Sequence, residues 1–532
     1  MLKKVLSCCI AATFGIYSAS SLAQSSVINS TENSQQPIAP LVLASSDDAI
    51  TDRYIVVLKQ PQMLMNDAVG LQQFTQQTVG LMANSFSIKT DDVFDSSIIG
   101  FVANLDALQL KQLRRDSRVE YIEQDQILSI DPVVSNEAVQ SNAIWGLDRI
   151  DQRNLPLDRN YNANFDGSGV TAYVIDTGVN NNHEEFGGRS VSGYDFVDND
   201  ADSSDCNGHG THVAGTIGGS QYGVAKNVNI VGVRVLSCSG SGTTSGVISG
   251  VDWVAQNASG PSVANMSLGG GQSTALDSAV QGAIQSGVSF MLAAGNSNAD
   301  ACNTSPARVP SGVTVGSTTS SDSRSSFSNW GSCVDLFAPG SQIKSAWYDG
   351  GYKTISGTSM ATPHVAGVAA LYLQENNGLT PLQLTGLLNS RASENKVSDT
   401  RGTTNKLLYS LADSGCEPDC GGPTPGPDPD GKLVSGVPVN GLSGSRGQKD
   451  YFYMDLQQGQ QLTVVTIGGT GDADLYLRFG DKPTLNTWDC RPYRSGNSET
   501  CTVNVTQSGR YHVMLNAYSA YSGLTLQANF QL

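Results

Sequence analysis

Charged residues are scarce in this chain of 532 residues. Lys, Arg, Asp and Glu make up only 15% of it, and the balance is acidic, with a formal net charge of −17. A protein that binds nucleic-acid phosphates needs an excess of basic residues, so the composition argues against that class. A hydrophobic fraction of 39% argues equally against a disordered chain. At about 150 residues per domain, the length predicts roughly three or four domains.

A run long enough to span a membrane is also missing. The N-terminal apolar run, 5–17, is shorter than the about 18 to 20 residues that a spanning helix needs. It follows Lys3 and Lys4 and precedes small residues that end at Ala23, which is the pattern of a secretory signal peptide over 1–23. We therefore expect a secreted, extracellular protein without a stable membrane anchor.

The cysteines lack the spacing of a zinc site, in which close cysteine pairs recur or are followed by paired histidines. Eight of the ten cysteines follow the signal peptide. An even number in an oxidising compartment predicts disulfides, although the sequence does not choose among the connectivities. The simplest expectation pairs them in chain order, as Cys206–Cys238, Cys302–Cys333, Cys416–Cys420 and Cys490–Cys501.

Residues 53–130 have the pattern of a small α+β unit. The runs 54–58 and 98–103 read as buried strands, the leucines between 105 and 115 fall at helical spacing, and 119–123 alternates as a strand does. A unit of this size folds only marginally alone.

Short apolar runs alternate with amphipathic stretches from Trp145 to about Leu411. This alternation predicts an α/β domain with a doubly wound, mainly parallel sheet and helices on both faces. Pro363 is expected in the first turn of a buried helix, where proline is tolerated. Strands are predicted at 170–175, 230–235, 263–266 and 288–293, and helices around 247–255 and 279–284.

The C-terminal part changes character again. Residues 416–435 are rich in proline and glycine and predict a linker. Beyond it, 436–532 contains period-two segments separated by glycine-rich turns, which predicts an all-β sandwich. Asp472 and Asp474 fit either a plain turn or a further ion site.

Histidine is rare, with five in the whole chain, so few residues can perform imidazole chemistry. Nucleophilic hydrolysis needs a hydroxyl, an imidazole and an orienting carboxylate. Asp176 ends an apolar strand, His209 lies in a glycine-rich segment, and Ser359 precedes a predicted helix. Each signal alone is weak, since a serine before a helix is commonly an N-cap. The Gly-x-Ser-x-Gly elbow of lipases and esterases is absent, which disfavours that alternative.

Three segments together resemble the signatures of the subtilisin family. They are Val-Ile-Asp-Thr-Gly at 174–178, Asn-Gly-His-Gly-Thr-His-Val-Ala-Gly-Thr at 207–216, and Ser-Gly-Thr-Ser-Met-Ala-Thr-Pro-His-Val-Ala-Gly at 356–367. The order Asp, His, Ser is that of subtilisin. The segment 145–150 and the cysteine placement make the chain most similar to secreted bacterial proteases of the proteinase K and aqualysin type.

The resemblance implies a serine endopeptidase that acts through an acyl-enzyme on proteins and peptides. Asp176 would orient His209, His209 would act as general base and then acid, and Ser359 would attack the scissile carbonyl. Asn296 would donate to the oxyanion together with the Ser359 backbone N–H. Two extended edges would pair with the substrate backbone. These edges are Ser239, Gly240, Ser241 and Gly242 on one side, and Ser267, Leu268 and Gly269 on the other.

Calcium is the cofactor that the resemblance implies, in a structural role. Hard oxygen ligands suit it, although by composition alone solvated acidic loops are an equal alternative. The first expected site contains Asp148, Asp151, Gln152, Asp158 and Asn160. The second expected site lies near Asp195, Asp198, Asp200 and Asp202. The third expected site combines Asp335 with the carbonyls of Pro310 and Gly312.

The flanking parts resemble a subtilase propeptide, which acts as chaperone and inhibitor until self-cleavage, and a bacterial pre-peptidase C-terminal domain. We expect a signal peptide at 1–23, a propeptide at 24–139, a catalytic domain at 140–415, a linker at 416–435 and a β-sandwich at 436–532. The mature protein is expected to be a monomer that does not bind nucleic acid. The alternatives are a binding protein on an inactive protease scaffold and a metalloprotease, which the motifs do not support.

Overall fold

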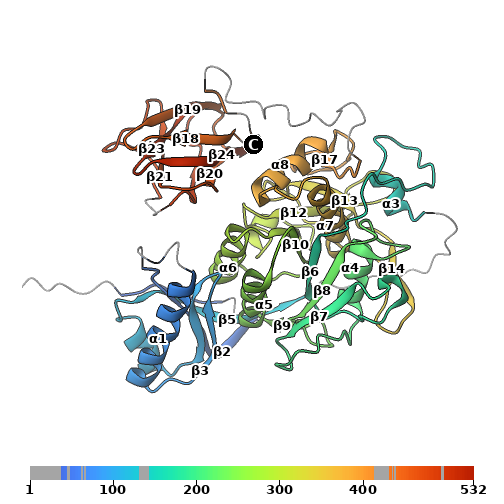
Figure 1. Cartoon of the computed structure of the whole chain (residues 1–532), viewed down its shortest axis with the longest axis horizontal. Coiled ribbons are helices and arrows are strands. Elements are labelled where there is room, and N and C mark those ends of the chain that lie inside the picture. The colour runs from blue at the N-terminus through green and yellow to red at the C-terminus, as the bar shows by residue number, and fades with distance from the viewer. Residues whose placement is uncertain are drawn as a thin grey trace, which may run out of the picture. The chain divides into compact units, whose positions relative to one another are not determined.

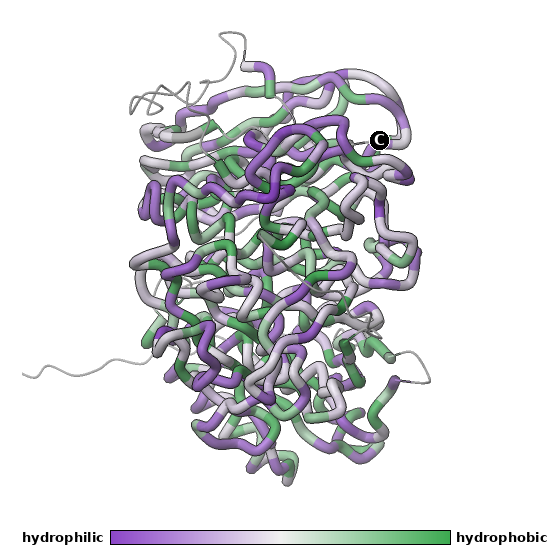
Figure 2. The backbone as a smooth tube through the Cα atoms, turned by 90° about the vertical axis from the view of Figure 1, so that its right-hand side faces the viewer, coloured by the Kyte–Doolittle hydropathy of each residue, from purple (hydrophilic) through white to green (hydrophobic). Residues whose placement is uncertain are grey.

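The computed structural model describes most of the chain downstream of the signal segment (Figure 1). The expected signal peptide, the expected start of the mature domain near Val139 and Gln140, and the Cys416–Cys420 pair lie outside the described residues. Figure 2 shows apolar and hydrophilic segments alternating along the backbone. The described residues are 38–44, 48–61, 64, 68–130, 143–411, 431–433, 435, 439–492 and 496–531.

The N-terminal part is an α+β unit, as its pattern predicts. The sheet order is β1-β5-β2-β4-β3, and helix α1 packs against β3 and β4. The strand run 54–58 is wholly buried because Val56 and Leu58 face this unit's own core while Ile55 and Val57 face a second core. The elements are β1 Leu41–Val42, β2 Ala49–Leu58, α1 Ala68–Phe86, β3 Thr90–Asp95, β4 Ile99–Asn104, α2 Ala107–Leu113 and β5 Val119–Ser129.

The central part contains a nine-stranded sheet of order β16-β17-β13-β12-β11-β10-β6-β8-β7. All its neighbouring pairs are parallel except β16 with β17, which confirms the predicted mainly parallel sheet. The strands are β6 Thr171–Asp176, β7 Ser190–Asp195, β8 Asn229–Arg234, β10 Ser262–Met266, β11 Ser289–Ala293, β12 Val313–Thr318, β13 Leu336–Pro339, β16 Ser393–Glu394 and β17 Lys406–Leu407.

Helices cover both faces of this sheet (Figure 1). Val174 faces a core with α4 and α7, and its neighbour Ile175 faces a core with α5 and α6, so successive residues of β6 are buried on opposite sides. The helices are α3 Trp145–Ile150, α4 His209–Gly218, α5 Thr244–Asn257, α6 Thr274–Gln285, α7 Thr358–Glu375 and α8 Pro381–Arg391, with short 3₁₀ turns η2 Glu184–Phe186 and η3 Ala301–Asn303. Strand β9 Ser241–Thr243 and the hairpin β14 Ile343–Ala346 with β15 Tyr352–Ile355 lie outside the large sheet.

The expectation that Pro363 lies in the first turn of its helix is wrong. Helix α7 begins at Thr358, so Pro363 lies inside it. A proline there leaves the carbonyl four residues earlier, that of Ser359, without its helical N–H donor. The Ser267 hydroxyl donates to that carbonyl at 2.9 Å and replaces the missing bond.

The C-terminal part is an all-β sandwich, as expected. A four-stranded sheet, β18-β24-β20-β22, and a three-stranded sheet, β19-β23-β21, are both antiparallel and enclose one apolar core. The strands are β18 Val439–Gly444, β19 Lys449–Leu456, β20 Gln461–Ile467, β21 Ala473–Phe479, β22 Glu499–Asn504, β23 Gly509–Ala517 and β24 Tyr521–Gln531.

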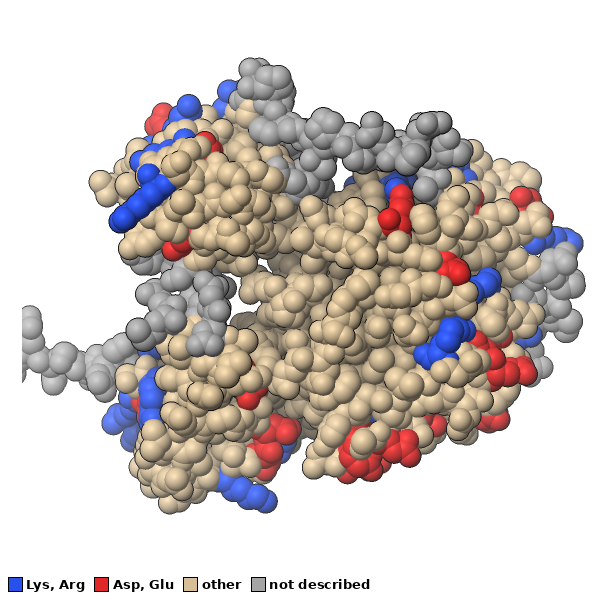
Figure 3. Space-filling view, in the orientation of Figure 1, with Lys and Arg blue, Asp and Glu red and all other residues tan. Residues whose placement is uncertain are grey.

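Three of the four expected disulfides are present, namely Cys206–Cys238, Cys302–Cys333 and Cys490–Cys501. The surface in Figure 3 carries few charged side chains, as the composition predicts. No helix among the described residues is long and apolar enough to cross a membrane.

Candidate active site

Three neighbouring parallel strands end at the candidate site. Asp176 is the last residue of β6, while Ser267 and Asn296 follow β10 and β11, and these strands lie in the order β11-β10-β6. Carboxyl ends of parallel strands meet at one edge of a sheet, which is where ligands bind in open α/β folds. Helices α4 and α7 pack against each other. Helix α4 begins with His209, and helix α7 begins with Thr358, which is followed by Ser359.

Asp176 and His209 form a buried hydrogen-bonded pair. His209 Nδ1 lies 2.8 Å from Asp176 Oδ1, and the two side chains are at most 1% exposed. A second donor, the Thr177 N–H, contacts the same oxygen at 2.7 Å. An imidazole that donates from Nδ1 to a carboxylate presents Nε2 as its proton acceptor, which is the tautomer that general-base catalysis requires.

Ser359 lies in the first turn of α7 and is 4% exposed. Its Oγ donates to the Ser267 carbonyl at 3.0 Å, while the Ser267 hydroxyl donates to the Ser359 carbonyl. Asn265 Nδ2 donates to the Ser267 hydroxyl at 2.8 Å and fixes its orientation. Two reciprocal hydrogen bonds therefore hold the serine against the end of β10.

Two N–H donors converge beside Gly357. Asn296 Oδ1 accepts from the Thr358 N–H at 2.8 Å, and the Nδ2 of the same amide borders the space beside Gly357. A methyl group placed on Gly357 would lie 3.3 Å from Asn296 Nδ2 and 3.6 Å from the Ser359 nitrogen. The missing side chain of Gly357 thus leaves a space that both donors border, as an oxyanion site requires.

The two expected substrate edges flank an extended segment of this same chain. The end of β5 pairs antiparallel with β9, so that Leu128 lies opposite Gly242 and Ser129 opposite Ser241. On its other side, Ser129 bridges to Gly269. The next residue, Ile130, donates its N–H to the Gly240 carbonyl at 3.0 Å. Residues 127–130 thus lie between both edges as an added strand would.

The remaining predicted edge residues do not pair with that segment through their backbones. Ser239 Oγ is 3.0 Å from Ser241 Oγ, and the Leu268 side chain is buried in the core shared with α5 and α6. Ser239 is therefore an exposed neighbour of one edge, Leu268 anchors the other in the core, and Ser267 is paired with Ser359.

The first expected calcium cluster is partly brought together in the structure. Asp148 accepts the N–H groups of Asp158 and Arg159, at 3.2 and 2.8 Å. Burial and the charges of Asp148 and Asp158 raise the pKa of Asp151, and Asp151 Oδ1 has no hydrogen-bond partner among the described residues. Gln152 Nε2 donates to the carbonyls of Asn154 and Pro156, and the Asn160 N–H donates to Asp158 Oδ1. A buried carboxylate oxygen without a donor fits a cation site.

The second expected cluster is only partly brought together. Arg234, from β8, donates to Asp195 at 2.5 Å and to Asp198 at 2.7 Å, so a protein cation already neutralises this pair. Asp200 and Asp202 instead accept local backbone N–H groups in an exposed turn.

At the third expected site, loss of solvent raises the pKa of Asp335 to about 7, although Asp335 accepts the Thr314 N–H at 2.7 Å. Pro310 and Gly312 immediately precede Thr314's strand, β12. The described residues contain no group of three or more His, Cys, Asp or Glu side chains placed to hold a metal. Any calcium site here would therefore need carbonyl and amide oxygens as well.

Two further histidines are structural. Burial lowers the pKa of His212 to about 3 and that of His364 to about 4. His212 Nε2 lies 3.0 Å from the Ile343 carbonyl and His364 Nδ1 lies 2.8 Å from the Met360 carbonyl. Both rings are neutral at ordinary pH, and a backbone carbonyl lies beside each of them.

These low values predict a loss of stability in acid. An unfolded histidine titrates near pH 6.5, so below that pH the unfolded chain binds protons that folded His212 and His364 do not, and the free energy of unfolding falls as the pH falls. Replacing His364 by Gln should reduce this dependence by about 1.4 kcal/mol per pH unit between about pH 6 and 4.5. Urea unfolding in the Ser359→Ala background, which prevents autolysis, measures it. Equal slopes in the two proteins would contradict the expectation.

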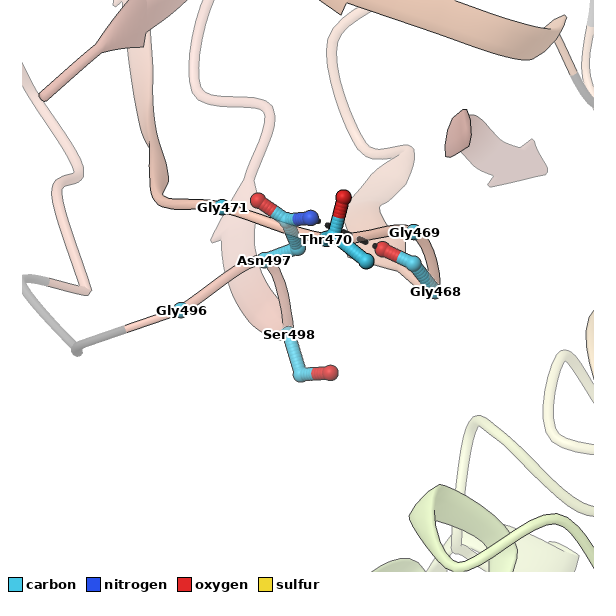
Figure 4. A pocket seen from close by; sticks show the side chains of 7 residues that line it. All are labelled: Gly468, Gly469, Thr470, Gly471, Gly496, Asn497 and Ser498. Carbon is cyan, nitrogen blue, oxygen red and sulfur yellow. Dashed lines mark hydrogen bonds between the residues drawn. The ribbon is translucent and has the colours of Figure 1, made fainter. Parts of the chain in front are cut away.

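A separate pocket of about 330 Å³ lies in the C-terminal sandwich (Figure 4). Its wall is the glycine-rich turn 468–471 with 496–498, and Asn497 links the two segments by donating to the Gly468 carbonyl at 2.9 Å. Asn497 Oδ1 accepts the Ala473 N–H, so this side chain is satisfied by the fold itself. The lining includes the hydroxyls of Thr470 and Ser498 but neither an imidazole nor a carboxylate that could activate them.

The chain is similar to a known serine exoprotease along its whole length. It is 73% identical over 534 residues to an alkaline serine exoprotease A of Vibrio alginolyticus, with all of both chains covered. The chain belongs to the subtilase family. The subtilase family model matches residues 167–410, the peptidase inhibitor I9 model matches 53–131, and the bacterial pre-peptidase C-terminal domain model matches 448–517.

More distant relatives share only part of this subtilase. An extracellular serine proteinase of Thermus sp. (strain Rt41A) is 50% identical over 70% of this chain and 92% of its own. A cuticle-degrading serine protease of Arthrobotrys oligospora is 42% identical over 70% of this chain and 94% of its own. The subtilase is therefore a serine protease, and its I9 domain is an intramolecular inhibitor.

Sequence reasoning missed two residues at this site, Asp205 and Gly357, and it placed Ser267 only in a substrate edge without foreseeing its contact with Ser359. Asp205, Gly357 and the Ser267 hydroxyl each contact the segments that carry Asp176, His209 or Ser359. Asp205 lies four residues before His209, and Gly357 lies two residues before Ser359; this closeness in sequence was the only signal available. Their contacts are made across the fold and have no local pattern.

Proposed function

We propose that this subtilase is a secreted endopeptidase in which Ser359, His209 and Asp176 are the catalytic triad and Asn296 contributes to the oxyanion site. The observation that supports it most is the buried Asp176–His209 pair at the same sheet edge as the Gly357 space. His209 Nε2 takes the proton of Ser359 Oγ while Oγ bonds to the scissile carbonyl carbon. The carbonyl oxygen becomes an oxyanion that receives hydrogen bonds from Asn296 Nδ2 and the Ser359 N–H.

Collapse of this intermediate breaks the C–N bond, and His209 gives its proton to the departing amine. Water then repeats the sequence on the acyl-enzyme: His209 accepts a proton from water, and Ser359 leaves with that proton. Asp176 stays ionised and stabilises the imidazolium in both halves.

Cleavage within chains, and not only at their ends, is supported by the two edges. Residues 127–130 lie between them and belong to a segment that continues in both directions along the chain. A groove that holds an internal segment admits an internal substrate bond. We further propose that the enzyme cleaves its own I9 domain from the catalytic domain, between Ile130 and Trp145 and near Val139 and Gln140.

Labelling and mass measurement test this function. The secreted wild-type protein, treated with a serine-directed phosphonyl fluoride, should have the mass of a processed chain that carries one adduct, and Ser359→Ala should carry none. A peptide blocked at both ends should be cleaved internally. Labelling of Ser359→Ala, or failure to cleave the blocked peptide, would contradict the triad or the endopeptidase assignment respectively.

Calcium fits the first and third sites as a structural ion. Asp148, Asp151, Gln152, Asp158 and Asn160 would hold one ion, with the partnerless Asp151 Oδ1 as the oxygen that most needs a cation. Asp335 with the Pro310 and Gly312 carbonyls would hold another. Bound calcium would supply fixed positive charge that ties loops together. At the second site, only Asp200 and Asp202 stay available, because Arg234 occupies Asp195 and Asp198.

Removal of calcium should therefore cost stability before it costs activity. A ligand that binds only the folded state stabilises it by about 2.7 kcal/mol at one hundred times its dissociation constant. EDTA should accelerate thermal inactivation while the initial rate on a short peptide stays unchanged. Asp151→Asn should reduce the protection that added calcium gives. Immediate loss of the initial rate, restored by zinc, would point to a metalloprotease instead.

The extracellular location and the monomeric state are also proposed. One of the relatives named above, that of Thermus, is described as extracellular, and the N-terminal segment has the pattern of a signal peptide. Intact mass of the protein recovered from culture medium would reveal removal of 1–23, and light scattering would give the oligomeric state.

A further inference from the structure

Asp205 is a buried carboxylate beside the proposed triad. It is 8% exposed and precedes α4 by four residues, next to the Cys206–Cys238 disulfide. Neither a triad member nor a calcium ligand, it has no part in the chemistry described so far. Burying an ionised carboxylate is costly unless its oxygens are fully hydrogen-bonded.

Five donors satisfy this carboxylate. Oδ1 accepts from Thr177 Oγ1 at 2.9 Å and from the N–H groups of Asn207 and Gly208 at 2.8 and 2.9 Å. Oδ2 accepts from the N–H and the Oγ1 of Thr211, at 2.9 and 2.6 Å. The donors come from two segments about thirty residues apart, because Thr177 follows β6 whereas the others surround the start of α4.

Each donor stands beside a triad residue. Thr177 is the neighbour of Asp176 and donates its own N–H to Asp176 Oδ1. Gly208 and Thr211 bracket His209 in the first turn of α4. The Thr177 hydroxyl, while donating to Asp205, accepts the Gly210 N–H at 2.9 Å, which also joins the two segments.

We infer that Asp205 is a positioning residue that holds the segments of Asp176 and His209 at the separation that their hydrogen bond needs. This inference rests on the proposed function, in which that pair activates Ser359. A carboxylate suits the position because it only accepts hydrogen bonds and has about four lone-pair sites. In either orientation, an asparagine would turn its NH₂ group toward at least one backbone N–H, which cannot accept a hydrogen bond.

The test compares Asp205→Asn with a matched control, Asp166→Asn. Asp166 is also a carboxylate that links distant segments, through Ser168, Asn227 and Gln374, but it lies before the amino end of β6, away from the triad. Active sites are counted with a phosphonyl fluoride. Asp205→Asn should lower kcat per labelled site by about 10²-fold with little change in KM, the effect of a small misplacement of reacting groups. Asp166→Asn should lower the melting temperature and keep kcat within about twofold.

A spectroscopic readout separates positioning from stability. In Asp205→Asn the low-field proton resonance of the His209 Nδ1–H should shift or disappear, while in Asp166→Asn it should be unchanged. If Asp205→Asn does not fold, Thr177→Val and Thr177→Ser decide, because only the second retains the hydroxyl that joins Asp205 to Gly210. The Thr177→Val variant should have a lower kcat than the wild type, and the Thr177→Ser variant should have a kcat close to that of the wild type.

The inference is wrong if Asp205→Asn retains wild-type kcat and the resonance, or if Thr177→Val and Thr177→Ser behave alike. Failure of the proposed function has a different signature. In that case the wild-type protein would not label at Ser359, and no comparison of kcat per labelled site would be possible.

Discussion

Replacing Ser359 by alanine is expected to lower kcat by about 10⁶-fold, the loss that removal of the nucleophile causes in subtilisin. The alanine has no oxygen to form the acyl-enzyme, while the oxyanion donors and the substrate edges remain. The residual rate should therefore still exceed that of the uncatalysed reaction, by about 10³ to 10⁴. Hydrolysis of a chromogenic peptide by the purified, correctly folded variant is the measurement.

The controls for this prediction come from the same chain. Ser356→Ala removes a hydroxyl three residues away that only accepts the Gln342 N–H, and it should leave kcat unchanged within about twofold. The double variant Ser359→Ala with His209→Ala should be no slower than either single one, because the two groups act as a unit. A Ser359→Ala protein that retains even one hundredth of wild-type activity would remove the serine from the mechanism.

Adding a methyl group at Gly357 is expected to lower kcat by at least about 10²- to 10³-fold, the cost of losing one oxyanion donor. The new Cβ would stand 3.3 Å from Asn296 Nδ2 and 3.6 Å from the Ser359 nitrogen, in the space where the oxyanion forms. The backbone φ at Gly357 is 166°, an extended conformation that alanine adopts freely, so the fold should be retained. KM should change little, because the ground-state substrate pairs mainly with the edges.

Asn296→Ala tests the same site by removing one donor instead of filling the space, and it should lower kcat by a similar factor of about 10² to 10³. Gly378→Ala is the matched control, since Gly378 is exposed and an added Cβ would meet nothing closer than Asn376 at 3.5 Å. Affinity for a peptide boronate, which mimics the tetrahedral intermediate, should fall in both Gly357→Ala and Asn296→Ala. A Gly357→Ala enzyme within tenfold of wild type would show that the oxyanion forms elsewhere.

Much of the fold could be predicted because the strands are buried on both faces. Such strands read as continuous apolar runs, and the runs at 170–175, 230–235, 263–266 and 288–293 all became strands of the large sheet. Helix α1 was missed, because its few buried residues, such as Leu71 and Met82, are separated by glutamine, threonine and glycine. The five buried residues fall at helical spacing, but two of them, Thr75 and Thr78, are polar, so the apolar residues alone mark the period only weakly.

The candidate site could be predicted in part. The position of Asp176 at a strand end is a local property of the sequence, and the structure confirms it. The position of Pro363 was predicted wrongly, because proline is favoured in the first turn of a helix. Inside the helix it removes one backbone hydrogen bond, and the hydroxyl of Ser267, a residue 96 positions earlier, replaces that bond. The sequence analysis did not foresee that Arg234 neutralises part of the second calcium cluster. Arg234 lies 36 residues from Asp198 in the sequence, and the two side chains meet only in the folded protein.

The sequence by itself determined which chemical groups are present, which strands are buried and which residues end them, because alternation, caps and strand ends are set within a few residues. Only the tertiary structure decided that Asn296 Nδ2 and the Ser359 N–H border one space at Gly357, that residues 127–130 lie between two edges, and that Asp205 gathers five donors around the Asp176–His209 pair. Hydrogen bonds act over about 3 Å. Which distant residues come within that distance depends on the order of the strands and the packing of the helices, and no local pattern records it.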